Sequence, residues 1–168
     1  MGGLIHKLKI LYLHIGLSKT GTSAIQAWLS KNSNKIIMQG FMYADATPKA
    51  AFGAVTSGNG VEFYHACESE DEERLVNILR DFYFLNYKYS IISSEVLQGL
   101  KMEKLTFLKK FCLKQGIEIR VIAFVRSIYE HLYSNYLQGI KRHGYGKPFG
   151  SYGHLDFREQ KQYLENYF

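Results

Sequence analysis

The sequence has little of what marks several common classes of protein. Only two cysteines, Cys67 and Cys112, occur among the 168 residues, too few for the disulfide framework of a small secreted domain. Neither belongs to a CxxC pair, and His, Cys and carboxylates nowhere cluster at metal-ligand spacing, so we expect free thiols and no metal site. No apolar run reaches the length of about 18 residues that a membrane-spanning helix needs. These absences favour a soluble, cytoplasmic protein without a transmembrane segment.

The charge is positive but not concentrated in any one stretch. The net charge is +6 and the pI about 9.2, which suits an acidic substrate or a polyanionic cofactor. The lysines and arginines are scattered, without the dense basic run of a nucleic-acid-binding arm, so no nucleic-acid partner is expected. With 46% hydrophobic residues, the chain can bury the core of one globular domain over residues 1–168.

One stretch, residues 10–29, combines three features that together favour anion binding. It opens with an apolar run typical of a buried strand, residues 10–15. A loop rich in glycine and hydroxyl groups follows, residues 16–23, and it carries Lys19. Next, Ile25 and Leu29 are spaced as on one face of a helix. A helix start presents unpaired N–H groups and a positive dipole end, and Lys19 adds a full charge, so the stretch predicts a phosphate cradle.

The position of the lysine distinguishes between classes of phosphate loop. The nucleoside-triphosphatase pattern GxxxxGK[ST] places Lys directly after its second Gly, whereas Lys19 precedes Gly21 by two residues. HIGLSKTGTSAIQAWL instead resembles the 5′-phosphosulfate loop of the sulfotransferase family, a PK[ST]G[ST][ST]-type loop after a strand, as in bacterial and carbohydrate members. Ser18 stands where a proline is common. A generic Gly-rich turn and a phosphate loop of another class are the alternatives.

The resemblance implies a donor, 3′-phosphoadenosine 5′-phosphosulfate (PAPS), bound by this loop. The residues implied to bind it are Gly16, Ser18, Lys19, Thr20, Gly21, Thr22 and Ser23.

Apolar runs alternate with amphipathic segments along the rest of the chain. We expect strands at 9–15, 89–93 and 117–125, a short strand or extended passage at 35–43, and helices at 22–30, 75–82, 104–114, 127–142 and 155–168. Residues 44–60 have no sustained period and are expected to form a long loop. Such alternation predicts an α/β fold, a three-layer αβα arrangement around a parallel sheet, with a topology like that of P-loop-containing nucleoside triphosphate hydrolases.

Ligands of parallel sheets bind outside the carboxyl ends of the strands. This rule brings the loop 16–23, the segment 93–95 and Arg126 to one edge of the sheet. In VIAFVRSIYEHLYSNYLQGIKRHG, Arg126 and Ser134 have the spacing of the sulfotransferase residues that bind the 3′-phosphate of the donor, and the resemblance implies that role. The Asn-Pro or Asp-Pro that usually follows the arginine is replaced by Ser127-Ile128. A structural arginine is the alternative.

Sulfuryl transfer needs a cation at the leaving phosphate and a base for the acceptor hydroxyl. Lys19 is the expected cation. Glu95, at the end of the 89–93 run, is the expected base, with first-turn helix stabilisation or substrate binding as alternatives. His65 is the second candidate, in a segment expected to belong to the long loop, although a lone histidine is more often packing or surface. His14 is expected to support the cradle from behind.

We therefore expect a PAPS-dependent sulfotransferase that acts on a hydroxyl of a glycan or other small acceptor, releases 3′,5′-bisphosphoadenosine (PAP) and uses no metal. Family members continue well beyond the point that matches Phe168, so the C-terminal part of the domain is expected to be lacking. One alternative is a truncated, non-catalytic domain that binds an adenine nucleotide or anion. A P-loop kinase is less favoured because of the lysine position.

Overall fold

The computed structural model describes residues 8–16, 19–44, 57–80 and 86–152. Its contacts divide the chain into two compact units, Met1–Phe124 and Val125–Phe168, and each unit is described by itself. The expectation that residues 1–168 form one domain stays a prediction. The expected helix at 155–168 lies outside the described residues.

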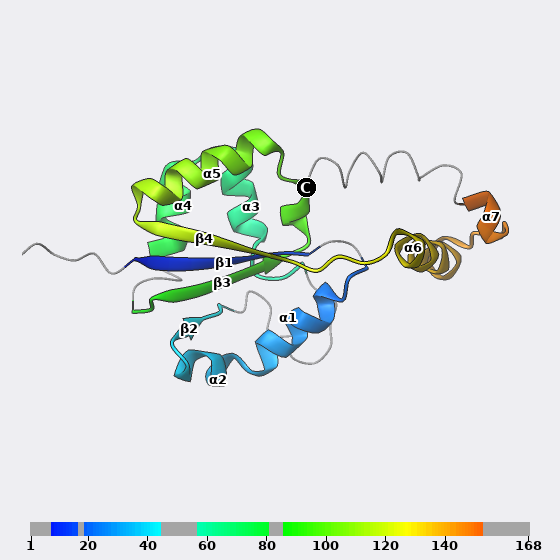
Figure 1. The fold of residues 1–168 in the computed structure, drawn as a ribbon, viewed down its shortest axis with the longest axis horizontal. Helices are drawn as coiled ribbons and strands as arrows, with labels where there is room; N and C mark the ends of the chain where they lie inside the picture. Colours follow the sequence, from blue (N-terminus) through cyan, green and yellow to red (C-terminus); the bar gives the residue numbers. More distant parts are fainter. Residues whose placement is uncertain (1–7, 17–18, 45–56, 81–85, 153–168) are drawn as a thin grey trace, which may run out of the picture. The chain divides into compact units, whose positions relative to one another are not determined.

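The first unit contains a four-stranded sheet in the order β2-β3-β1-β4 (Figure 1). The strands are β1 (Lys9–Ile15), β2 (Phe41–Met42), β3 (Tyr89–Ser94) and β4 (Ile117–Ala123). All pairings are parallel, and Ile15 is aligned with Ser94 on one side and with Ala123 on the other. The expected α/β fold with a parallel sheet is therefore confirmed, and β1, β3 and β4 end at the same edge.

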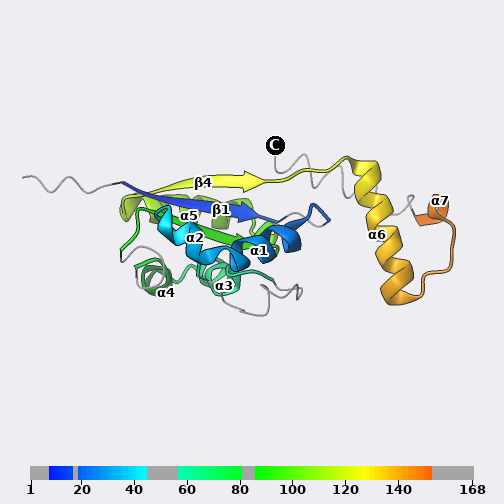
Figure 2. The same cartoon turned by 90° about the horizontal axis from the view of Figure 1, so that it is seen from below.

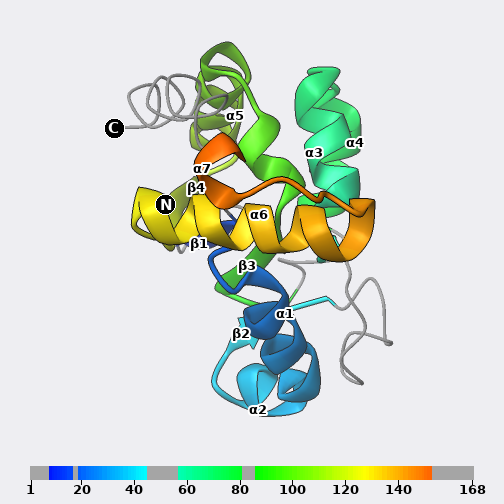
Figure 3. The ribbon, with the colours of Figure 1, turned by 90° about the vertical axis from the view of Figure 1, so that its right-hand side faces the viewer.

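Helices cover both faces of this sheet. In Figure 3, α1 (Thr22–Lys31) and α2 (Ser33–Met38) lie on one side of the strands. On the other side lie α3 (Val61–Glu68), α4 (Glu72–Asn77) and α5 (Met102–Lys114). A short 3₁₀ helix, η3 (Val96–Gly99), follows β3.

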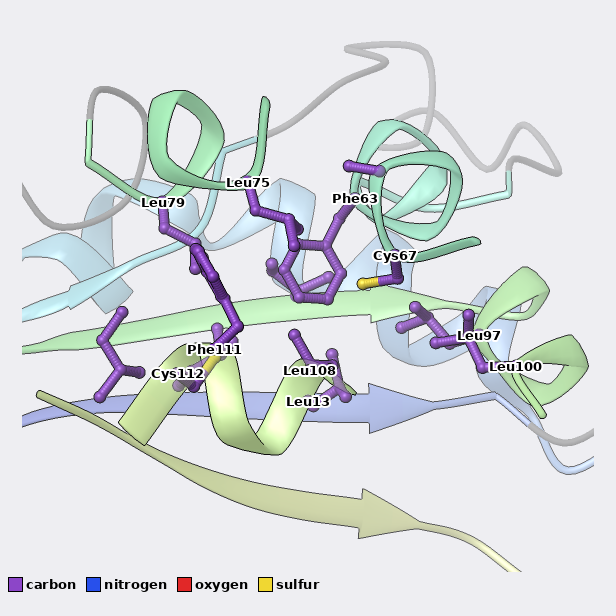
Figure 4. Close-up of a cluster of buried hydrophobic side chains, with 14 of the residues drawn as sticks. Leu13, Phe63, Cys67, Leu75, Leu79, Leu97, Leu100, Leu108, Phe111 and Cys112 are labelled. Carbon is purple, nitrogen blue, oxygen red and sulfur yellow. The ribbon is translucent and has the colours of Figure 1, made fainter. Parts of the chain in front are cut away.

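The main core lies between the sheet and α3, α4 and α5 (Figure 4). Alternate residues of β1 point to this face, and Leu11 and Leu13 are fully buried against Phe63 of α3 and Phe111 of α5. Burying such side chains stabilises the fold by about 1.5–3 kcal/mol each. A smaller cluster, formed by Leu29, Ile36 and Tyr43, packs on the opposite face.

Both cysteines belong to the main core as free thiols. Burial raises the pKa of Cys67 and of Cys112 to about 12. The thiolate, which is the reactive form, is therefore disfavoured at neutral pH, and the two cysteines serve as packing residues.

Two segments differ from the expectation. The expected strand or extended passage at 35–43 is wrong for most of its length, because residues 33–38 form α2 and only Phe41–Met42 pair as β2. Short apolar runs do not distinguish a strand from a helix, and within α2 only Ile36 is buried. The segment with His65 is also a helix, α3, and Phe63, Ala66 and Cys67 form its buried face.

The second unit contains α6 (Ile128–His143) and α7 (Phe149–Tyr152). The Ser127 side chain accepts a hydrogen bond from the Glu130 backbone N–H at 3.3 Å, which caps α6. The Tyr136 ring lies 5.3 Å from that of Phe149, and its hydroxyl donates to the Lys147 carbonyl at 3.0 Å. These contacts fold the segment after α6 back along the helix. Nowhere in the described ranges of either unit is there a helix with the length and apolarity to span a membrane.

Candidate functional site

The loop after β1 reverses direction through two left-handed residues. Lys19 has φ 62° and Gly21 has φ 87°. For a residue with a side chain, this conformation costs about 1–2 kcal/mol, so the fold holds Lys19 in a strained position. Strain of this kind is concentrated at ligand-binding sites. Ser18 lies outside the described residues.

The amino end of α1 is suited to an anion. Gly21 is the N-cap residue, no side chain caps the helix, and its first turn contains no acidic residue. The helix has ten residues, so its dipole places partial positive charge at this end. Thr20 and Ser23 are half-buried beside it. Lys19, Thr20 and Gly21 thus directly precede an uncapped helix start, and Thr22 and Ser23 begin the helix.

Close packing explains the glycine at the entrance to this loop. A Cβ atom on Gly16 would lie 2.4 Å from Cγ2 of Thr22, which is buried at the start of α1. Gly16 also donates its N–H to the Ser94 carbonyl at 3.2 Å. The loop is therefore anchored to α1 on one side and to the end of β3 on the other.

This anchoring brings Glu95 next to the loop. Glu95 directly follows Ser94, is half-buried and is the residue from which η3 begins. The start of the loop 16–23 and the segment 93–95 thus lie together, as expected, through the contact of Gly16 with Ser94. Whether Glu95 acts as a base stays a prediction.

The other predicted residues lie on different elements. His65 is exposed on α3, where the Tyr64 and His65 ring centroids are 5.4 Å apart. The expectation that it belongs to a loop is wrong, and its role stays a prediction. Arg126 and Ser134 belong to the second unit, where Arg126 Nε lies 3.2 Å from a carboxylate oxygen of Glu130. Lys19 belongs to the first unit, and the expectation that Arg126 and Ser134 lie near it stays a prediction.

The sequence did not predict the role of Asn59, which forms hydrogen bonds with the backbone of β3 as a neighbouring strand would. Its side-chain Oδ1 accepts from the Ser93 N–H at 2.8 Å, and its Nδ2 donates to the Ile91 carbonyl at 3.1 Å. Its own N–H donates to the Ser93 carbonyl at 3.1 Å. Strand β2 pairs with β3 only as far as Ser90, so Asn59 satisfies the polar groups that β2 leaves. In the sequence, the glycines on either side of Asn59, Gly58 and Gly60, were the signal of a close approach between backbones.

The segment around Asn59 approaches β3 very closely. Gly58 has φ 77°, and a Cβ atom there would lie 1.9 Å from the Ser93 carbonyl oxygen. The Ser94 hydroxyl donates to the Ser57 carbonyl. Only glycine permits this approach, which lets residues 57–59 bond to the end of β3 directly before Glu95.

His14 supports the same edge from inside the sheet. It is 3% exposed, its Nδ1 lies 2.7 Å from the Ser93 hydroxyl, and its ring centroid lies 5.6 Å from that of Phe124. Burial lowers the pKa of His14, so the imidazole is neutral at neutral pH. Within the described part of the chain, its Nε2 and the Oε1 of Gln26 are buried without a hydrogen-bond partner. His14 thus contacts Ser93 at the end of β3, and its expected role in supporting the cradle stays a prediction.

The neutral burial of His14 predicts a loss of stability in acid. The unfolded chain takes up a proton near the ordinary pKa of 6.5, whereas the folded chain does so only at lower pH. The free energy of unfolding should therefore fall as the pH drops below 6.5, by up to about 1.4 kcal/mol per pH unit. Urea unfolding at several pH values should show this slope in the parent and a smaller slope in His14→Gln. Parallel slopes would contradict the assignment.

Among the described residues, no three His, Cys, Asp or Glu side chains come together in a group that could hold a metal ion. Comparison of the chain with protein-family models, with curated proteins and with solved structures found no match in any of the three.

Proposed function

We propose that this protein is a sulfotransferase that moves a sulfuryl group from PAPS to a hydroxyl acceptor, such as that of a saccharide. The observation that carries the proposal is the pair of left-handed residues, Lys19 and Gly21, at the uncapped and acid-free start of α1. The resemblance of the loop sequence to the sulfotransferase 5′-phosphosulfate loop selects the ligand class. The strand order, with this loop after the central strand β1, supports a P-loop-like topology.

Each step of the reaction has a candidate residue. The acceptor oxygen attacks sulfur, the bond from sulfur to the 5′-phosphate oxygen breaks, and the hydroxyl proton passes to a base. Negative charge grows on the leaving phosphate, where Lys19 and the α1 amides are the proposed stabilising groups. Thr20 and Ser23 would hold phosphate or sulfuryl oxygens. Glu95 is the proposed base because of its position next to the loop. It directly follows Ser94, whose carbonyl oxygen accepts a hydrogen bond from the Gly16 N–H.

Substitution of Glu95 tests the proton-transfer step. Glu95→Gln keeps the size of the side chain but cannot accept the proton, so the rate of transfer should fall about 10²-fold or more. PAP binding should change little, because the base does not contact the nucleotide in this scheme. A rate within a factor of about two of the parent would show that Glu95 is not the base. His65→Gln would then be the next variant to measure.

The resemblance to sulfotransferases supplies the proposed residues for the far end of the nucleotide. Arg126 and Ser134 are proposed to hold the 3′-phosphate, since a planar guanidinium binds phosphate oxygens in pairs and keeps its charge. The Arg126 ion pair with Glu130 is exposed, so exchanging it for a phosphate costs little.

Isothermal titration calorimetry tests the proposed ligand without requiring the acceptor. PAP should bind in the absence of metal and more tightly than ATP with Mg²⁺. Arg126→Ala should weaken PAP binding about tenfold or more, because the guanidinium makes charge-assisted hydrogen bonds. A preference for ATP with Mg²⁺ would overturn the proposal in favour of a kinase. PAP binding without transfer to any acceptor would favour the alternative of a non-catalytic nucleotide-binding domain.

A further inference from the structure

Within the described residues of the first unit, β4 is an edge strand, and its residues 120–123 are exposed. It pairs with β1 and, within the described residues, has no strand on its other side (Figure 2). Its register with β1 places Glu118, Arg120 and Ile122 on the same face as Tyr12 and His14. The cluster of α1 and α2 residues on this face packs near Phe41 and Ile91, at the β2–β3 side of the sheet. As a result, Arg120 is exposed and Ile122 is 39% exposed.

An open edge with exposed apolar residues is a site for pairing with another strand. On the opposite face of β4, Val121 is 59% exposed. We propose that β4 pairs antiparallel with β4 of a second copy of this chain, in a register centred on Ile119, to form a continuous eight-stranded sheet in a homodimer.

The charges of β4 select this partner and this register. Arg120 Nε lies 2.7 Å from the Glu118 carboxylate within one chain, two residues apart on one face. Centring the antiparallel pair on Ile119 places each Glu118 opposite the partner's Arg120, so both cross-strand pairs are attractive. Centring it one residue earlier or later places two glutamates or two arginines opposite each other, which is unfavourable.

The other face of the same register is apolar. Ile117 comes opposite the partner's Val121, and the two Ile119 side chains meet at the axis. Burying Val121 removes a large exposed hydrophobic side chain from water. Strand β4 thus has one charged face and one apolar face, whose Ile117 and Ile119 belong to or pack against the main core and whose Val121 is exposed. In this register each face is complementary to itself, as an isologous twofold interface requires.

The opposite edge of the sheet explains why this association closes at two copies. Strand β2 has only two residues, and Asn59 occupies the polar groups of β3 beyond it. Among the described strands, β4 therefore offers the long free edge, and pairing through it consumes that edge in both copies. The product is a dimer rather than an open-ended fibre.

Sedimentation equilibrium of the whole chain at low salt tests the proposal through charge exchange. Glu118→Arg and Arg120→Glu each create two like-charged pairs and should raise the dimer dissociation constant about tenfold or more. The double variant E118R/R120E restores both attractive pairs and should return the constant to within a few-fold of the parent. An equimolar mixture of the two single variants should form a heterodimer, because each pair is then unlike again.

Two exposed positions on other elements provide matched controls. Glu73→Arg on α4 and Lys35→Glu on α2 make the same changes in net charge and should leave the dissociation constant unchanged. Circular dichroism establishes that each variant is folded. A chain that stays monomeric at every concentration would overturn the proposal. So would a dimer that the single variants weaken no more than the controls, or that the double variant fails to restore.

Discussion

Lys19→Ala is expected to lower the rate of sulfuryl transfer about 10²- to 10³-fold, the usual effect of removing one group that stabilises charge in a transition state. The charge on the leaving phosphate is larger in the transition state than in the bound donor. The same substitution should therefore weaken PAP binding much less, by about tenfold or less. Single-turnover transfer measured beside calorimetric titration of PAP separates the two effects.

Two further variants distinguish the charge of Lys19 from its backbone conformation. Lys19→Arg keeps the charge and should retain most of the rate. Lys19→Gly relieves the left-handed strain but lacks the charge, so it should be as slow as Lys19→Ala. If Lys19→Gly were as active as the parent, the loop would act through its backbone alone. If Lys19→Ala lost less than tenfold in rate, the lysine would not be the stabilising cation.

Much of the first unit could be predicted because its signals are local. Strand β1 and helix α1 were expected almost to the residue, since an apolar run, a glycine loop and a helical spacing follow one another within about twenty residues. The same holds for α5, which ends where Gly116 adopts φ 67°. The alternation of strands and helices was enough to predict the parallel sheet.

The parts that could not be predicted depend on tertiary contacts. The residues of α2 carry an apolar run that suits either a strand or a helix, and the packing of Ile36 with Leu29 and Tyr43 decides between them. Asn59 lies in a stretch without period, and its role depends on β2 ending at Met42, which no local pattern shows. The spacing of Phe63, Ala66 and Cys67 is that of one helix face and could have predicted α3. The segment was instead grouped with the loop that precedes it.

The candidate site divides in the same way. The proximity of the Lys19 loop to Glu95 follows from the pairing of β1 with β3, because parallel strands that align at Ile15 and Ser94 bring their following residues together. Arg126 comes after the end of β4, in the second unit, and its part in the site depends on the nucleotide it is proposed to hold. Titration of PAP with Arg126→Ala therefore tests the proposed role of Arg126, which strand pairing does not determine.

Gly58→Ala is expected to be the most destabilising glycine-to-alanine substitution among the described glycines of the first unit. The left-handed backbone alone costs a residue with a side chain about 1–2 kcal/mol. In addition, the new Cβ would overlap the Ser93 carbonyl oxygen, so the segment must move away from β3 and break the hydrogen bonds of Asn59. Together these effects should lower the free energy of unfolding by about 3 kcal/mol or more.

Gly40→Ala is the matched control, because Gly40 has φ 85° but no atom within 4 Å of its Cβ position. Its free energy of unfolding should fall only by the cost of the left-handed backbone conformation, about 1–2 kcal/mol. Urea unfolding of both variants at pH 7.5 measures the difference. Equal losses of stability in the two variants would mean that the segment at Gly58 can move away from Ser93 without an energetic cost. A larger loss at Gly58, with slower transfer by the folded fraction, would show that this contact with Ser93 also positions Glu95, because the close approach at Gly58 and the proposed base belong to one short end of β3.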